Sequence, residues 1–162
     1  MDFKYFPTLP LKEILQKWCD VLSTDQDIID YCMAKYGKAP TVFVGLDVRD
    51  SPGEEDCPLI VVFPGDKNEG LKQANYQYNL SIGFVILQEN FTTTGNVREY
   101  HGIYEVDDIA QLSLKAVVVA SEDYPVSQAT IRIDLTEHQP QYAGHMDLTI
   151  DIPVTMGAEL SY

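Results

Sequence analysis

The sequence has few basic residues: 11 Lys and Arg stand against 25 Asp and Glu, which leaves a formal net charge of −14 over 162 residues. Proteins that bind nucleic acid neutralise phosphates with clustered Lys and Arg, and here the basic residues are scattered along the chain. We therefore expect no sequence-specific binding of nucleic acid. The acidity fits a solvated surface that keeps the molecule soluble, and it also fits a surface that binds a basic partner.

Cysteine is scarce and apolar runs are short. Cys19, Cys32 and Cys57 are odd in number and show no C-x-x-C spacing, which favours reduced thiols in a cytoplasmic protein over a disulfide framework. No apolar run approaches the ~20 residues that a transmembrane helix needs. Residues 1–4 lack the basic start and the apolar core of a secretory signal. We expect a cytoplasmic protein that does not bind membranes.

Histidine is also scarce, and its spacing does not suit a metal site. The three histidines are His101, His138 and His145, and none lies three to five residues from another His or a Cys, as metal ligands often do. His138 and His145 flank one predicted turn, so together with Asp147 they can approach one another and form a metal or acid–base site. The interpretation that we favour is a pair of surface histidines at the end of a hairpin.

Signatures of nucleophilic catalysis and of phosphate or calcium binding are missing. A nucleophile–histidine–acid arrangement can be drawn through Ser81 or Cys57, but no nucleophile elbow surrounds either residue. Segment 65–70 has a Lys between glycines, yet it lacks the G-x-x-x-x-G-K-[ST] order and precedes a strand rather than a helix. The acidic segment 47–56 lacks the alternating ligands of a calcium loop. The sequence predicts no catalytic, cofactor-binding or metal-binding residue, and no enzyme.

Alternation of apolar and polar residues is the clearest pattern that the sequence contains. From Tyr76 to Leu87 every second residue is large and apolar, which places one face of a long strand in the core. The same period recurs in 131–135 and 146–154, and three such strands can pair into an antiparallel sheet with one apolar face. The apolar series are Tyr76, Tyr78, Leu80, Ile82, Phe84 and Ile86; Ile131, Ile133 and Leu135; and Met146, Leu148, Ile150, Ile152 and Val154.

Helical spacing of apolar residues predicts an N-terminal helix pair. The first helix is expected from about Pro10 to Leu22, because proline suits a first helical turn, where its missing N–H has no partner to lose. Thr24, with an acidic residue three positions later, resembles the N-cap of a second helix. Gly37 then provides the C-terminal stop that a left-handed residue favours.

A third helix is predicted near the middle of the chain. Asp107 or Asp108 can cap it, and an apolar stripe continues through about Ser121. The valine triplet 117–119 favours a strand instead. We choose the helix because the pattern is longer than a typical strand.

Two further segments are expected to complete the sheet, in addition to the three alternating strands. Thr41–Leu46 is β-branched and aromatic, and Leu59–Phe63 is a continuous apolar run of the kind found in strands that are covered on both faces. We place the second of these in the middle of the sheet, with helices over one side. Strands from Ala129 to Glu137 and from Tyr142 to Thr155 are predicted to pair as a hairpin around residues 139–141.

The connecting segments 47–56, 64–70 and 88–102 are polar and are expected to be exposed, the last as a mobile crossing segment. A chain of this length buries roughly two thirds of its surface as one domain. The sequence therefore predicts a single domain, 1–162, of class α+β. We expect a mostly antiparallel twisted sheet of about five strands, with the N-terminal helix pair and one further helix packed on one face.

The order of these elements resembles the small tail terminator, or tail-completion, proteins of long-tailed bacteriophages and prophages. The N-terminal helices through residue 40, Val42 to Gly45, Cys57 to Gly65 and Tyr78 to Leu87 carry the resemblance. It is a likeness of pattern over most of the chain, and segment 88–102 has no counterpart in it. The resemblance implies a small α+β subunit that assembles as a ring, commonly hexameric, which caps the tail tube and offers a docking face to the head. The family has no catalytic residues to carry over.

Three hypotheses of function follow. The first is a structural phage or prophage tail protein, a homo-oligomeric ring that contacts tail-tube and head-completion proteins, in the bacterial host cytoplasm during assembly and then in the virion tail. The second is an acidic decoy or inhibitor that binds a basic protein surface, which the charge of −14 supports. The third is a small enzyme that uses His138, His145 and Asp147.

Overall fold

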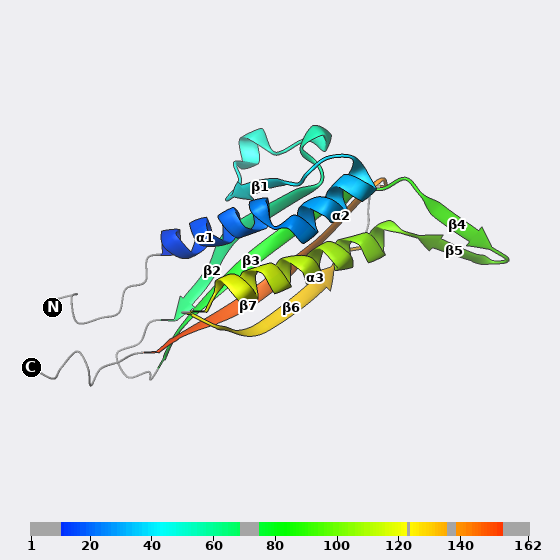
Figure 1. The fold of residues 1–162 in the computed structure, drawn as a ribbon. Coiled ribbons are helices and arrows are strands. Elements are labelled where there is room, and N and C mark those ends of the chain that lie inside the picture. The colour runs from blue at the N-terminus through cyan, green and yellow to red at the C-terminus, as the bar shows by residue number, and fades with distance from the viewer. Residues whose placement is uncertain (1–10, 69–74, 123, 136–138, 154–162) are drawn as a thin grey trace, which may run out of the picture.

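The computed structural model describes residues 11–68, 75–122, 124–135 and 139–153. Within these ranges the chain forms three α-helices, a five-stranded sheet and a separate two-stranded hairpin (Figure 1). The mostly antiparallel sheet, the N-terminal helix pair and the further helix confirm the predicted α+β class.

The five-stranded sheet has the strand order β1-β2-β3-β7-β6. β1 and β2 are parallel, and every other neighbouring pair is antiparallel. β3 and β7 form its centre and pair without interruption over their whole length. β2 is an internal strand beside this centre rather than the middle strand that its apolar run predicts. The strands are β1 (Thr41–Val44), β2 (Leu59–Asn68), β3 (Asn75–Leu87), β6 (Val126–Ile133) and β7 (Gln141–Pro153).

The predicted alternation is confirmed from Tyr78 to Ile86 and from Met146 to Ile150, whereas the predicted positions Tyr76, Ile152 and Val154 lie outside the residues whose side chains the structure describes. Alternate side chains of β3 and β7 are buried on one face, and those between them face the other side. Burial of so many large apolar groups, at roughly 1.5–3 kcal/mol each, is the main stabilising contribution to the sheet. The buried series are Tyr78, Leu80, Ile82, Phe84 and Ile86 in β3, and Tyr142, Met146, Leu148 and Ile150 in β7.

The pattern prediction is less successful for β6. This strand ends at Ile133 instead of continuing to Glu137, and residues 136 and 137 lie outside the described ranges. Ile133 is 40% exposed and Leu135 is 92% exposed, so the expected apolar face of 131–135 is buried only at Ile131, and there in part. β6 is an edge strand, so it has a neighbouring strand on one side only.

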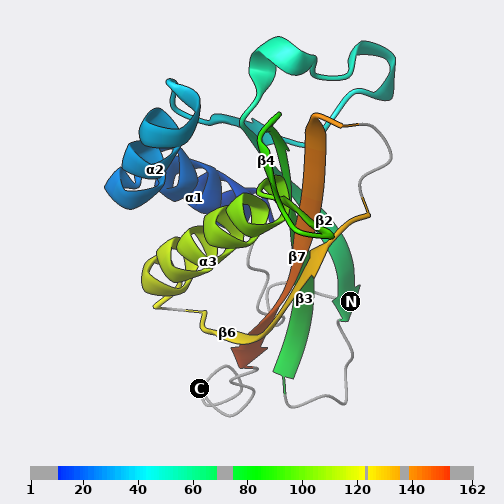
Figure 2. The same ribbon diagram turned by 90° about the vertical axis from the view of Figure 1, so that its right-hand side faces the viewer.

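All three helices cover the same face of the sheet (Figure 2). Their apolar sides, together with the buried series of the sheet, form one core. The Trp18 indole N–H donates a buried hydrogen bond of 3.0 Å to the Ser121 hydroxyl, which joins the first helix to the end of the third. No described helix combines the length and the apolar character needed to cross a membrane. The helices are α1 (Leu11–Thr24), α2 (Gln26–Tyr36) and α3 (Gly102–Ala120).

The ends of α2 differ in part from the prediction. Asp25, not Thr24, is the N-cap: its carboxylate accepts a hydrogen bond of 3.1 Å from the Ile28 N–H. The Thr24 hydroxyl instead donates to the Asp20 carbonyl within α1, so α1 runs to Thr24 and α2 follows after one residue. Gly37 ends α2 with a φ of +75°, as predicted.

α3 confirms the choice of helix over strand for residues 117–119, but it begins earlier than predicted. Its first residue is Gly102, more than one turn before Asp107. In the first turn of α3, the buried Glu105 carboxylate accepts hydrogen bonds of 3.0 and 2.8 Å from the Gln88 side chain. A satisfied carboxylate in the first turn also interacts favourably with the helix dipole.

Two of the segments predicted to be loops contain strands. β2 continues through Asn68 with a shift of register between Pro64 and Lys67. Segment 88–102 is not a crossing segment, because it holds a hairpin of β4 (Phe91–Thr94) and β5 (Val97–Tyr100).

The sheet face opposite the helices is partly covered at one end and polar at the other. Segment 47–56 forms two short 3-10 turns beyond the end of β1, on the side away from α3 (Figure 2), and its Glu54 and Glu55 are exposed as predicted. Leu59 and Val61, which face this side, are buried. Towards β7 the face carries hydrogen-bonded side chains, of which the Ser81 hydroxyl donates to Asp147 at 2.6 Å.

Candidate assembly surfaces

The hairpin β4–β5, residues 91–100, extends from the body of the molecule and is called the arm below (Figure 1). Its strands are antiparallel, and Gly95 makes the turn with a φ of +60°, a conformation that glycine adopts at no steric cost. The strands pack against each other and hardly at all against other helices or strands. Since a lone two-stranded hairpin is marginally stable in water, the arm would gain stability by binding another surface.

One face of the arm carries an aromatic and cationic cluster. Phe91 and Tyr100 lie opposite each other with ring centroids 5.4 Å apart. The Arg98 guanidinium lies 5.1 Å from the centroid of the Phe91 ring, and Phe91 is 47% exposed. Arg98 forms no ion pair with any residue that the structure describes. Aromatic side chains and Arg are the residue types that are enriched in protein interfaces.

The arm has no net charge, in contrast to the chain as a whole. Residues 91–97 carry no charged side chain, and Arg98 and Glu99 cancel. Two copies of a protein with a net charge of −14 repel each other. Contact through the neutral arm therefore brings two copies together with less electrostatic repulsion than contact through the acidic surface.

A groove of about 600 Å³ lies at the base of the arm, between β5, the start of α3 and the segment after β6. It is bordered by the exposed apolar side chains of Ile103, Tyr104 and Leu135. Tyr142 of β7 lines its inner side. Exposed apolar areas of this kind are typical of protein contact sites.

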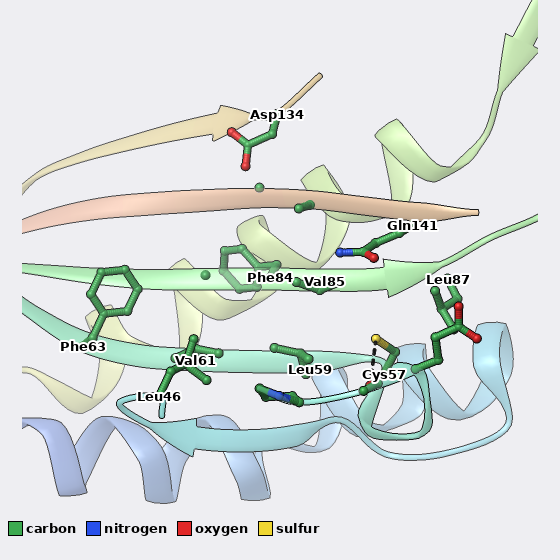
Figure 3. A pocket seen from close by; sticks show the side chains of 16 residues that line it. Leu46, Cys57, Leu59, Val61, Phe63, Phe84, Val85, Leu87, Asp134 and Gln141 are labelled. Carbon is green, nitrogen blue, oxygen red and sulfur yellow. Dashed lines mark hydrogen bonds between the residues drawn. The ribbon is translucent and has the colours of Figure 1, made fainter. Parts of the chain in front are cut away.

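A second apolar area is a pocket of about 450 Å³ on the sheet face opposite the helices, called the back-face pocket (Figure 3). Leu59 and Val61 of β2 and Val85 of β3 form its floor. Phe63 and Leu46 stand at one end, where they are 39% and 56% exposed. Segment 52–57 closes the opposite end, where Pro52, Gly53, Glu54 and Cys57 line the pocket.

The rim of the back-face pocket is acidic. Glu54 contributes one carboxylate from a 3-10 turn, and Asp134 contributes another from the residue after β6. Asp134 also lines the groove at the base of the arm, so the two apolar areas adjoin. Asp134 lies 3.5 Å from His145 Nδ1, whereas Glu54 forms no ion pair within the described ranges.

Of the residues weighed for catalysis, the structure brings Ser81, His145 and Asp147 together, but not in the order of a catalytic triad. His145 Nε2 lies 3.8 Å from Asp147, and the Ser81 hydroxyl donates to the same carboxylate. The carboxylate, and not the imidazole, thus contacts the hydroxyl, whereas a triad needs the imidazole against the nucleophile. His138 lies outside the described residues.

The remaining chemical candidates lie apart from one another. His101 is at the N-cap position of α3 and makes no side-chain capping bond. Cys57 lines the back-face pocket, and burial raises the pKa of its thiol, which is opposite to the shift that activates a cysteine. No group of three or more His, Cys, Asp or Glu side chains within the described ranges is arranged to hold a metal ion.

The arm was not predicted from the apolar–polar pattern of the sequence. The polar composition of 88–102 predicts an irregular segment, yet the turn chemistry in the same residues predicts a hairpin. Phe91–Thr94 and Val97–Tyr100 are two short runs that contain β-branched and aromatic residues, and they are separated by Gly95-Asn96 alone, a known signal for a two-residue hairpin turn. The back-face pocket has no comparable signal, because three strands and a loop distant in sequence form it.

No protein-family model matches the chain, and no curated protein matches it. Among solved structures, the chain is similar to a chain described as "Virion of native gene transfer agent (GTA) particle", with 12% sequence identity and a TM-score of 0.45. The similarity covers 86% of this chain and 93% of that chain.

Proposed function

We propose that the protein is a structural, non-catalytic tail subunit of a phage or prophage, a tail terminator that forms a ring at the end of the tail tube and docks the head. The observation that carries the proposal is the arm, which exposes an aromatic–arginine cluster and packs little on its own chain. The order of helices and strands resembles that of tail terminator proteins. This resemblance is the reason why we propose a tail terminator and not another kind of ring.

A ring requires a heterologous contact, in which one patch of each subunit binds a different patch of the next. The molecule offers two kinds of exposed apolar surface on different elements, the arm and the back-face pocket. A self-complementary patch would stop at a dimer, whereas two distinct patches allow the head-to-tail contact that closes into a ring. This arrangement favours a ring over a simple dimer.

The net charge opposes assembly in dilute buffer. Like charges are screened over a distance of ~10 Å at 0.1 M salt and over shorter distances at higher salt. With a net charge of −14 per subunit, we expect monomers at low salt and low concentration, and rings as either rises. Contacts with tail-tube and head-completion proteins would add to this driving force during assembly in the host cell.

The test is the oligomeric state. Light scattering across a series of salt and protein concentrations should show a discrete jump in mass, and negative-stain microscopy should show closed rings under the same conditions. Purified tail tubes should retain the protein in a pelleting assay. A protein that stays monomeric throughout and does not bind tail tubes would contradict the proposal.

The second candidate function is an acidic decoy that binds a basic protein surface. The exposed acidic side chains of segment 47–56, among them Asp47, Asp50, Glu54 and Glu55, favour it. The two candidates differ in one measurement: a decoy would remain monomeric alone and would form a salt-sensitive complex with a basic partner, whereas a tail terminator would assemble with itself.

A further inference from the structure

We propose that the arm of one subunit docks in the back-face pocket of the next copy, with Phe91 against the apolar floor and Arg98 against the acidic rim. This inference rests on the proposed ring and names the contact that would build it. The occupant is a second copy of this chain, and the two partner surfaces are both visible in a single subunit (Figures 1 and 3).

Chemical complementarity is the first argument. The arm presents an exposed ring with a stacked guanidinium that lacks an acidic partner among the described residues. The back-face pocket presents an apolar floor, built from Leu59, Val61 and Val85, with carboxylates at its rim. A guanidinium donates paired, charge-assisted hydrogen bonds to a carboxylate, and an aromatic anchor in an apolar pocket is the usual centre of a strong interface.

Separation of the two surfaces is the second argument. None of residues 91–100 lines the back-face pocket of its own chain. The arm extends along the strand direction beyond the sheet (Figure 1), whereas the pocket lies over β2, β3 and β7. The contact is therefore available between copies, and it joins unlike patches as a closing ring requires.

The choice of acidic partner follows from the contacts already present. The Asp134 carboxylate already has a partner within its own chain, because its Oδ1 lies 3.5 Å from His145 Nδ1. Glu54 is exposed and free of ion pairs within the described ranges, and it lines the pocket from the 3-10 turn Glu54–Asp56. We therefore assign Glu54 as the main partner of Arg98.

A charge-swap experiment tests this pairing under the conditions in which the wild-type protein forms rings. Arg98→Glu and Glu54→Arg should each raise the concentration of half-assembly roughly tenfold or more, because each variant brings like charges together. Mixing the two variants in equal amounts should restore assembly, since every contact joins opposite charges when the two variants alternate around the ring. The double variant should also assemble on its own. Native mass spectrometry can verify equal amounts of the two variants in the mixed assemblies.

Matched controls separate this effect from net charge. Lys12→Glu changes the charge as Arg98→Glu does, and Glu122→Arg changes it as Glu54→Arg does; both positions are exposed and distant in sequence from the arm and the pocket. The controls should assemble as the wild type does. Restoration on mixing also shows that each variant is folded, because each must supply one intact surface.

The outcomes distinguish the docking from the proposed function. If the wild type forms rings and both single variants form them equally well, the docking contact is wrong and the ring stands. Loss of assembly in the single variants without recovery on mixing also overturns the pairing. If the wild type never assembles, the proposed function itself fails.

Discussion

Ile82 of β3 is fully buried against the helix layer, whereas Asn79, three residues earlier in the same strand, lies on the opposite face. The Thr149 hydroxyl donates to Asn79 at 2.8 Å. The face on which a side chain lies should therefore decide how well a negative charge is tolerated, since a buried charge without a partner is costly.

The first prediction compares these two positions. Ile82→Asp should lower the free energy of unfolding by about 4 kcal/mol or more, or prevent folding. Asn79→Asp should change it by less than about 1 kcal/mol, because the Thr149 hydroxyl can donate to a carboxylate as well as to an amide oxygen. Urea melts of both variants measure the difference. Equal losses would mean that both faces of β3 exclude water to the same degree.

At the scale of single elements, α3 lies so close to β7 that two positions admit only glycine. A Cβ atom at Gly102 would overlap the ring of Tyr142, and one at Gly144 would lie 2.7 Å from Val106 Cγ1. By contrast, a Cβ at Gly83 would find its nearest neighbour at 3.9 Å, an ordinary contact.

The second prediction uses this contrast. Gly102→Ala should destabilise the protein by about 1–3 kcal/mol, because the buried Tyr142 ring or the start of α3 must shift. Gly83→Ala should be neutral within about 0.5 kcal/mol. Thermal or urea melts of the two variants give the answer, and a tolerant Gly102 would show that α3 can move away from β7 at low cost.

α2 carries the third prediction, on alkaline stability. Burial raises the pKa of Cys32 to about 11. It also raises the pKa of Tyr36, and that of Tyr31, whose hydroxyl in addition donates to Asp108 at 2.9 Å. Between pH ~9 and pH 11 the folded protein keeps protons on these side chains that the unfolded chain releases. The stabilisation is therefore complete below pH ~9, the ordinary pKa of a thiol, and is lost as the pH rises towards 11.

Urea melts between pH 8 and pH 10.5 should show a fall in the free energy of unfolding on the order of 2 kcal/mol. Tyr31→Phe should make this fall shallower, because it removes one of the contributing groups. A free energy of unfolding that is independent of pH over this interval would contradict the assignment.

Elements with a strong internal period could be predicted from the sequence, and elements set by tertiary position could not. The alternation in β3 and β7 and the helical stripe of α1 are properties of the local chain. In contrast, the end of β6 at Ile133 and the early start of α3 depend on distant partners, such as the Gln88 side chain that bonds Glu105. The back-face pocket could not be predicted, because it is formed when segment 52–57 closes over three strands.

At the scale of the whole molecule, the arm contacts the body mainly through Tyr100, which is partly buried and packs against the core. The fourth prediction is that replacing residues 91–99 with a short Gly-Ser linker, with Tyr100 kept, leaves the body folded. Its melting temperature should change by no more than about 5 °C, since none of residues 91–99 belongs to the core and a change of about 1 kcal/mol in the free energy of unfolding shifts the melting temperature by only a few degrees. The same variant should form no rings under conditions in which the wild type does.

Calorimetry and light scattering on one sample measure both properties. A large loss of thermal stability would mean that the arm supports the groove at its base. Rings formed by the shortened protein would mean that another surface mediates assembly.

The polar pairs on the open face of the sheet affect how the protein unfolds. Ser81 is opposite Asp147 and Asn79 is opposite Thr149 in the ladder between β3 and β7, and both pairs are hydrogen-bonded. A slip of one residue would separate both pairs and turn the apolar series to water. A substitution in the core therefore lowers the stability of the sheet but does not make a shifted register favourable. We expect such a variant to unfold cooperatively and not to persist with its strands paired in the wrong register.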